Sequence, residues 1–170
     1  MGEERDERFG EGGFTLLELL VVLTVIGIIV SIAVPTFLSA RSTAQRTAAQ
    51  ADLRTALTAA TTAYVDTPDQ TFAETGMDQL SSAEPAIHWV ADHATQPGTL
   101  AVFTTDGAGQ VVVDENGTPA IGFASYAADG TCWYAFQSDN HPPLYGRGPA
   151  AGGCDASQAA DYSSSPSIPS

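Results

Sequence analysis

Residues 13–20 read GFTLLELL, and the chain stays apolar from there to Leu38. A helix needs about 20 consecutive apolar residues to cross a bilayer, so the stretch 14–38 is long enough to do so. Glu18 is its one ionisable side chain. Insertion scales put an Asp, Lys or Arg in the middle of a membrane helix at roughly 2.5–3.5 kcal/mol, and such groups are usually paired and functional. We therefore expect Glu18 to have a partner.

The partner of Glu18 is not a basic side chain, because none lies between Arg8 and Arg41. Cleavage of the chain between Gly13 and Phe14 would supply one, since it leaves a positive α-amino group at Phe14. A helix places Glu18 about 6 Å along its axis from Phe14. In a packed bundle of helices, the amine of one copy would meet the carboxylate of another.

A polar leader ending in Gly13, followed by FTLLE at 14–18 and an apolar run that contains Pro35, resembles the type IV prepilin signature of bacterial pilins and pseudopilins. The resemblance implies that a prepilin peptidase cuts after Gly13 and methylates the new amine of Phe14. It also implies that Glu18 neutralises that amine on a neighbouring subunit during filament assembly. Assembly should favour subunits in register, because a misplaced neighbour leaves a buried charge unpaired.

The leader, residues 1–13, carries five acids and two arginines, a net charge of −3, whereas leaders of this family tend to be positive. Charge therefore does not settle the orientation of the span, and the cytoplasmic placement of the leader follows from the resemblance alone. Two simpler interpretations are a secretory signal with its cleavage site at 31–33 and a plain membrane anchor. Neither explains the acid at the start of the apolar run or its spacing from Gly13.

The chain has a net charge of −14, and setting aside the −3 of the leader leaves −11 on the rest. Its basic residues are six arginines, with no lysine. So few cations make a poor grip on phosphate backbones, and we expect no direct binding of nucleic acid. The missing lysine also excludes covalently linked surface pili, whose subunits are joined through Lys side chains. A polymer of this chain must be held together by helix packing.

The helical pattern continues past the apolar span, with apolar residues at three- and four-residue steps that predict one face packed on a sheet. These residues are Ala49, Leu53, Leu57, Ala60 and Tyr64. We predict one helix over residues 14–65, which anchors the chain and supports a globular head. Arg41 and Arg46 lie just beyond the span. They would either meet acidic groups of neighbouring subunits or form a solvated polar face.

Gly27 and Pro35 weaken this helix locally. Pro35 has no N–H to donate to the carbonyl of Ser31, and Gly27 costs about 1 kcal/mol relative to Ala. We expect a kink at Pro35. The resemblance implies that the segment between the two residues loses helical hydrogen bonds in an assembled filament, and a static, kinked span is the alternative.

Beyond residue 85 the sequence changes to short β-type runs separated by Asp-Gly and Asn-Gly turn signals. We predict strands at 87–90, 100–105, 111–114, 121–127 and 132–136, with tight turns at 106–107, 116–117 and 129–130. The expected fold class is α+β, with the long N-terminal helix packed on a four- to five-stranded antiparallel sheet. The expected divisions are a leader (1–13), a transmembrane or filament-core half of the helix (14–38), a globular head (39–162) and a flexible tail (163–170).

Cys132 and Cys154 are the only cysteines. An even number in a chain expected to be exported indicates a disulfide, with free or metal-bound thiols as the alternative. The bond would stabilise the fold by roughly 3 kcal/mol and tie down an irregular segment at 137–153. The arrangement also resembles the C-terminal disulfide loop of many pilins.

Signals for enzyme chemistry are weak, and we expect neither an enzyme nor a bound cofactor or metal site. The histidines match no metal-binding motif; they are His88, His93 and His141. One option for calcium remains: Asp129, Asp139 and Asn140 lie near the cysteines, and the corresponding loop of some major pseudopilins binds this ion.

These observations predict a structural subunit of a type IV pilus, a single-pass membrane protein as the precursor and part of a cell-surface filament once assembled. Its partners would be the prepilin peptidase, identical and related pilin subunits, and an inner-membrane assembly platform with a cytoplasmic ATPase. Such pili support adhesion, surface motility or DNA uptake. The alternatives are a pseudopilin of a type II secretion or competence system and a membrane-anchored surface binding protein that does not polymerise.

Overall fold

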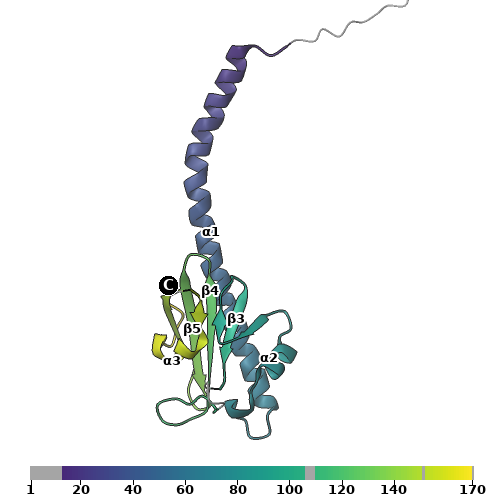
Figure 1. Ribbon diagram of the computed structural model, residues 1–170, viewed down its shortest axis with the longest axis vertical. Helices are drawn as coiled ribbons and strands as arrows, with labels where there is room; N and C mark the ends of the chain where they lie inside the picture. Colours follow the sequence, from purple (N-terminus) through teal and green to yellow (C-terminus); the bar gives the residue numbers. More distant parts are fainter. Residues whose placement is uncertain (1–12, 106–109, 151, 170) are drawn as a thin grey trace, which may run out of the picture. The chain divides into compact units, whose positions relative to one another are not determined.

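The computed structural model describes residues 13–105, 110–150 and 152–169. It divides into two compact units, one ending at Ala40 and the other beginning at Arg41. The elements in chain order are α1 (Leu16–Asp66), η1 (Phe72–Glu74), α2 (Met77–Ala83), β1 (His88–Ala91), β2 (His93–Ala94), β3 (Thr99–Phe103), β4 (Ala120–Ala127), β5 (Thr131–Ser138), β6 (Leu144–Pro149), β7 (Cys154–Asp155), η2 (Ala156–Gln158), α3 (Ala159–Tyr162) and β8 (Ser163–Ser165) (Figure 1).

Helix α1 has 51 residues and begins two positions later than predicted, at Leu16. Its part in the second unit is rich in Ala, the best helix former. Threonine hydroxyls on this part donate hydrogen bonds to backbone carbonyls one turn earlier. Thr55 donates to the carbonyl of Ala51 at 3.1 Å, and Thr58 donates to that of Arg54 at 3.1 Å. The helix ends where Thr67 Oγ1 donates to the carbonyl of Tyr64 at 2.8 Å.

The main sheet has six strands in the order β1-β3-β4-β5-β6-β8, so the predicted number of four or five is wrong. All neighbours are antiparallel except β1 and β3, which are parallel. Strands β4 and β5 form the central hairpin, pairing from Ala120 with Ser138 to Ala127 with Thr131. The turn between them contains Gly130 at φ 85°, which confirms the turn expected at 129–130.

The prediction of a strand at 111–114 is wrong. The structure shows two isolated β-bridges there, which pair Thr105 with Val111 and Val113 with Pro119. A tight turn does follow, in which the N–H of Gly117 donates to the carbonyl of Asp114 at 3.0 Å. The turn predicted at 106–107 lies outside the described residues.

The core of the second unit has two layers, because alternate side chains of a strand point to opposite faces of the sheet. On one face Leu100, Val102, Phe123, Trp133 and Ala135 pack with the buried side of α1. The other face is covered by a second cluster, which includes Ala101, Ala124, Tyr134, Ala156 and Ala159 from β3, β4, β5, η2 and α3. Both faces of the sheet are therefore buried, and the central strands are apolar almost throughout.

The C-terminal stretch departs from the prediction of an irregular segment at 137–153 followed by a flexible tail from 163. Strand β6 lies inside that segment and pairs with β5 over six positions. Strand β8 pairs with β6, Ile168 packs against the core, and Gln50 Nε2 donates to the carbonyl of Pro169 at 3.4 Å. The tail prediction is therefore wrong for residues 163–169.

Candidate functional site

The predicted cleavage site lies just before α1. Gly13 and Phe14 are outside any helix or strand, and the side chain of Phe14 is 86% exposed. A Cβ atom built on Gly13 would meet nothing within 4 Å. The bond between them is thus on open backbone, the kind of segment in which proteases find their substrates.

Thr15 is a residue of this region that the sequence prediction missed. Its hydroxyl accepts a hydrogen bond from the N–H of Glu18 at 3.2 Å, and its carbonyl accepts one from Leu19 at 3.2 Å. Thr15 is therefore the N-cap of α1, and Glu18 is the third helical residue. The spacing Thr-x-x-Glu is the sequence signal of a capping box, and a carboxylate in the first turn is stabilised by the helix dipole.

From Leu16 to Leu38 the helix α1 is apolar and exposed on every side, with no buried residue. An 18-residue window of it has a mean hydropathy of 2.8, so the helix is long and apolar enough to cross a membrane. Its hydroxyl groups donate hydrogen bonds to backbone carbonyls of the same helix; for instance, Thr24 Oγ1 donates to the carbonyl of Leu20 at 2.8 Å. An apolar surface of this kind requires lipid or other helices around it.

Helix α1 continues through Gly27 and Pro35 without a break. A Cβ atom on Gly27 would meet nothing within 4 Å, so no contact inside the chain requires a glycine there. Just after Pro35, the hydroxyl of Thr36 bonds to the carbonyls of Ile32 at 2.8 Å and Ala33 at 3.0 Å. Both the kink and the loss of helical hydrogen bonds in a filament stay predictions.

Cys132 and Cys154 form a disulfide, with their Cα atoms 5.4 Å apart. Both are fully buried, and the bond joins the start of β5 to β7. The predicted disulfide is confirmed, and the alternative of free or metal-bound thiols is wrong.

The three residues considered for calcium do not form one site. Asp129 precedes β5 and Asp139 and Asn140 follow it, and a strand of eight residues spans roughly 25 Å. Asp139 instead accepts hydrogen bonds from the hydroxyl of Thr71 at 2.7 Å and the N–H of Phe72 at 2.8 Å. Within the described ranges, no three His, Cys, Asp or Glu side chains are grouped to hold a metal.

His141 lies beside Ser138 and Asp114. Ser, His and Asp are the residue types of the catalytic triad found in many hydrolases. The Nδ1 atom of His141 is 3.2 Å from Ser138 Oγ and 3.6 Å from Asp114 Oδ2. A catalytic relay needs the two contacts on different ring nitrogens, and here both use Nδ1. Asp114 instead organises a turn, and the N–H of Thr118 keeps the pKa of its carboxyl below the usual value.

The other two histidines lie apart from this group. His88 is exposed on β1, and His93 Nε2 is 3.3 Å from Asp155 Oδ2. Neither belongs to a metal-binding cluster of the described residues.

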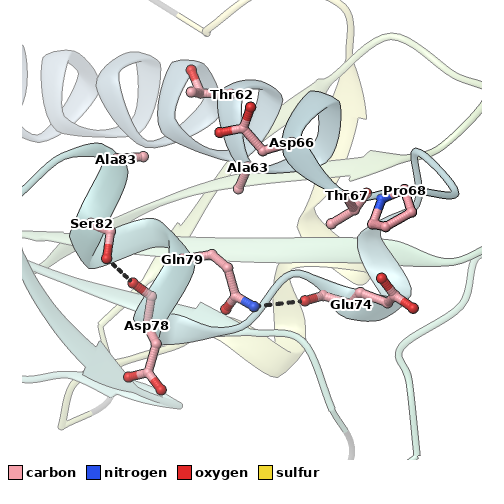
Figure 2. A pocket seen from close by; sticks show the side chains of 10 residues that line it. All are labelled: Thr62, Ala63, Asp66, Thr67, Pro68, Glu74, Asp78, Gln79, Ser82 and Ala83. Carbon is pink, nitrogen blue, oxygen red and sulfur yellow. Dashed lines mark hydrogen bonds between the residues drawn. The ribbon is translucent and has the colours of Figure 1, made fainter.

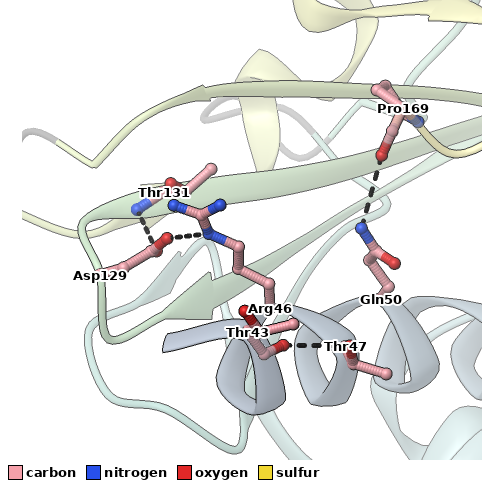
Figure 3. Close-up of polar contacts among 7 residues, drawn as sticks. All are labelled: Thr43, Arg46, Thr47, Gln50, Asp129, Thr131 and Pro169. Atoms are coloured by element: carbon pink, nitrogen blue, oxygen red, sulfur yellow. Dashed lines mark hydrogen bonds and ion pairs between the residues drawn. The ribbon is translucent and has the colours of Figure 1, made fainter. Parts of the chain in front are cut away.

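Arg46 pairs within its own chain, with its Nε bonded to Oδ2 of Asp129 (Figure 3). Burial works to raise the pKa of Asp129, but the bond from Arg46 and another from the N–H of Thr131 at 3.1 Å hold it below the usual value. Neither sequence-based alternative for Arg46, a neighbouring subunit or a fully solvated face, included this contact.

Two pockets of opposite charge lie in the second unit. One of about 750 Å³ is between the end of α1 and α2, and its lining includes Asp66, Glu74 and Asp78 but no cation (Figure 2). Another of about 550 Å³ is between the first turns of α1 in this unit and strands β5 and β6. It is lined by Arg46 and Arg147 and by no acid.

Comparison with known proteins gives one match. A family model described as a prokaryotic N-terminal methylation motif matches residues 8–34, a range that includes Gly13, Phe14, Glu18 and Gly27. No curated protein and no solved structure matches the chain. The role of the head must therefore be inferred from its own structure.

Proposed function

Because residues 8–34 carry a type IV pilin-like prepilin signature, we propose that the chain is a structural subunit of a type IV pilus. Prepilin peptidase cuts the membrane-anchored precursor after Gly13 and methylates the amine of Phe14. An inner-membrane platform with a cytoplasmic ATPase then adds the mature subunit to a filament. On the cell surface, that filament serves adhesion, motility or DNA uptake.

The observation that carries the proposal is one carboxylate in the otherwise apolar and exposed stretch of α1 from Leu16 to Leu38. Glu18 lies in the first turn of α1, four positions after Phe14, where the helix dipole stabilises it in a single subunit. In a filament core the surroundings are other apolar helices, and an unpaired charge there is costly. Pairing with the Phe14 amine of a neighbour removes this cost for subunits that are in register. A plain membrane anchor would have no need of such a carboxylate.

The test compares two isosteric replacements that each remove one negative charge, Glu18→Gln and Glu115→Gln. Glu115 is exposed in a turn of the second unit and serves as the matched control. We expect both variants to be cleaved at Gly13, and we expect only Glu18→Gln to lose filaments. Processing is read from the mass of the N-terminal peptide, and assembly from the amount of sheared filament. Normal filament yield from Glu18→Gln would overturn the proposed role.

The same preparation separates the alternatives. Long filaments whose subunits begin at methylated Phe14 support a pilus subunit. Cleavage without long filaments, together with a secretion or competence defect, would indicate a pseudopilin. Protein that keeps residues 1–13 and stays monomeric would indicate a surface binding protein that does not polymerise.

A further inference from the structure

The 550 Å³ pocket, called here the basic groove, gathers cations in an acidic molecule. Two of the six arginines of the chain, Arg46 and Arg147, line it beside Thr47, Thr131 and Trp133. The bond from Arg46 to Asp129 uses one of five guanidinium donors, and the Arg46 side chain is 54% exposed. The groove therefore presents guanidinium donors to its occupant, although Asp129 offsets the charge of Arg46.

Trp133 forms part of the groove wall, and its side chain also belongs to the core cluster between the sheet and α1. The residue is 2% exposed, and its indole Nε1 is buried without a hydrogen-bond partner among the described residues. A buried donor left without an acceptor retains the full cost of its desolvation. The donors that line the groove are the guanidinium groups of Arg46 and Arg147, and a carboxylate is a group that would meet them.

The 750 Å³ pocket, called here the acidic end, has the opposite need. Asp66, Glu74 and Asp78 are exposed around it (Figure 2). Asp66 is the last residue of α1, where the helix dipole is already negative, and the last turn contains no basic residue. Negative charge is thus added to negative charge, and a cation supplied from outside would relieve the repulsion.

The two surfaces lie at opposite ends of the same helix segment. Arg46 and Asp66 are twenty residues apart on α1, which is about 30 Å along the axis. A contact between two different patches is heterologous, so it can repeat from copy to copy and build an open fibre. We propose that the basic groove of one copy binds the acidic end of another copy. This inference rests on the proposed function and adds which surfaces of the head meet.

Charge reversal tests the contact. Arg147→Glu and Glu74→Arg each place like charges together between copies, and we expect each to lower filament yield roughly tenfold or more. The double variant restores complementarity, so its yield should return most of the way. The two residues line different pockets, one at each end of the α1 segment of the second unit, and rescue can therefore arise only between copies. Glu115→Arg, outside both surfaces, is the control and should assemble normally.

Melting temperatures of the detergent-solubilised chain show whether each variant is folded. Folded single variants with normal yield, or a folded double variant without rescue, would overturn the contact while leaving the pilus proposal intact. A wild-type chain that forms no filaments would overturn the pilus proposal itself.

Cross-linking tests the same contact in a way that does not depend on charge. Thr47 lines the basic groove, Ser82 lines the acidic end, and both are exposed. A chain with Thr47→Cys and Ser82→Cys should give a ladder of disulfide-linked oligomers from oxidised filaments. Thr58 is exposed on the same helix and lines neither pocket, so Thr58→Cys with Ser82→Cys should give none. Equal ladders from the two pairs, or none from the first, would refute the proposed docking.

Discussion

Replacing Leu53 tests how the head is built. The buried face of α1 is made almost entirely of alanines, with Leu53 and Leu57 as its two large side chains. Leu53 is 1% exposed and packs in the cluster that joins this face to the sheet. Leu53→Ala removes three carbon atoms, worth about 0.8 kcal/mol each in transfer free energy. Adding the cavity gives a loss of about 3 kcal/mol, because the small neighbouring alanines cannot fill it.

The measurement is the free energy of unfolding of the whole chain in detergent, from denaturant titration followed by tryptophan fluorescence. Trp133 suits this purpose because it is buried in the same cluster as Leu53. Val65→Ala is the matched control, since Val65 is 59% exposed near the end of the same helix. It should change stability by less than about 0.5 kcal/mol, whereas Leu53→Ala should lower the melting temperature by about 10 °C.

Two outcomes would refute the reasoning. If Leu53→Ala stays within about 0.5 kcal/mol of the wild type, the helix is not docked on the sheet through this residue. If Val65→Ala costs as much as Leu53→Ala, the buried face of the helix has been assigned wrongly.

Three further predictions concern the head. Reducing the Cys132–Cys154 bond, which closes a loop of sequence separation 22, should lower stability by about 3 kcal/mol, and an unchanged denaturation midpoint would contradict this. Gly146→Ala should cost about 1–3 kcal/mol and protect β8 less from hydrogen exchange, because the new Cβ would collide with the backbone of Tyr162. Folding lowers the pKa of Asp129, so the stability that its carboxylate contributes is complete above pH about 4 and is lost as the pH falls further. The melting temperature of Asp129→Asn should therefore fall less between neutral and acidic pH than that of the wild type. An equal fall in the two proteins would argue against this.

The head shows where reasoning from sequence ends. The β4–β5 hairpin was predictable because Asp129-Gly130 separates two apolar runs, and the disulfide because the chain has two cysteines. Strand β6 reads LYGRGP and β8 reads SSS, and neither has the alternation or the β-branched residues of a typical strand. They are strands because β5 offers an edge to β6, and β6 in turn offers one to β8.

The long helix, the one carboxylate of its apolar stretch and the cleavage motif all follow from the sequence alone, because each depends on residues close together in the chain. The capping role of Thr15 was also within its reach, since Thr-x-x-Glu is a local signal. The folded chain alone shows that residues 163–169 contact the rest of the head and that Arg46 reaches Asp129. It also shows that opposite charges gather at the two ends of the α1 segment of the second unit. Such pairings join residues far apart in the chain, and their energies depend on burial and distance, which no local pattern encodes.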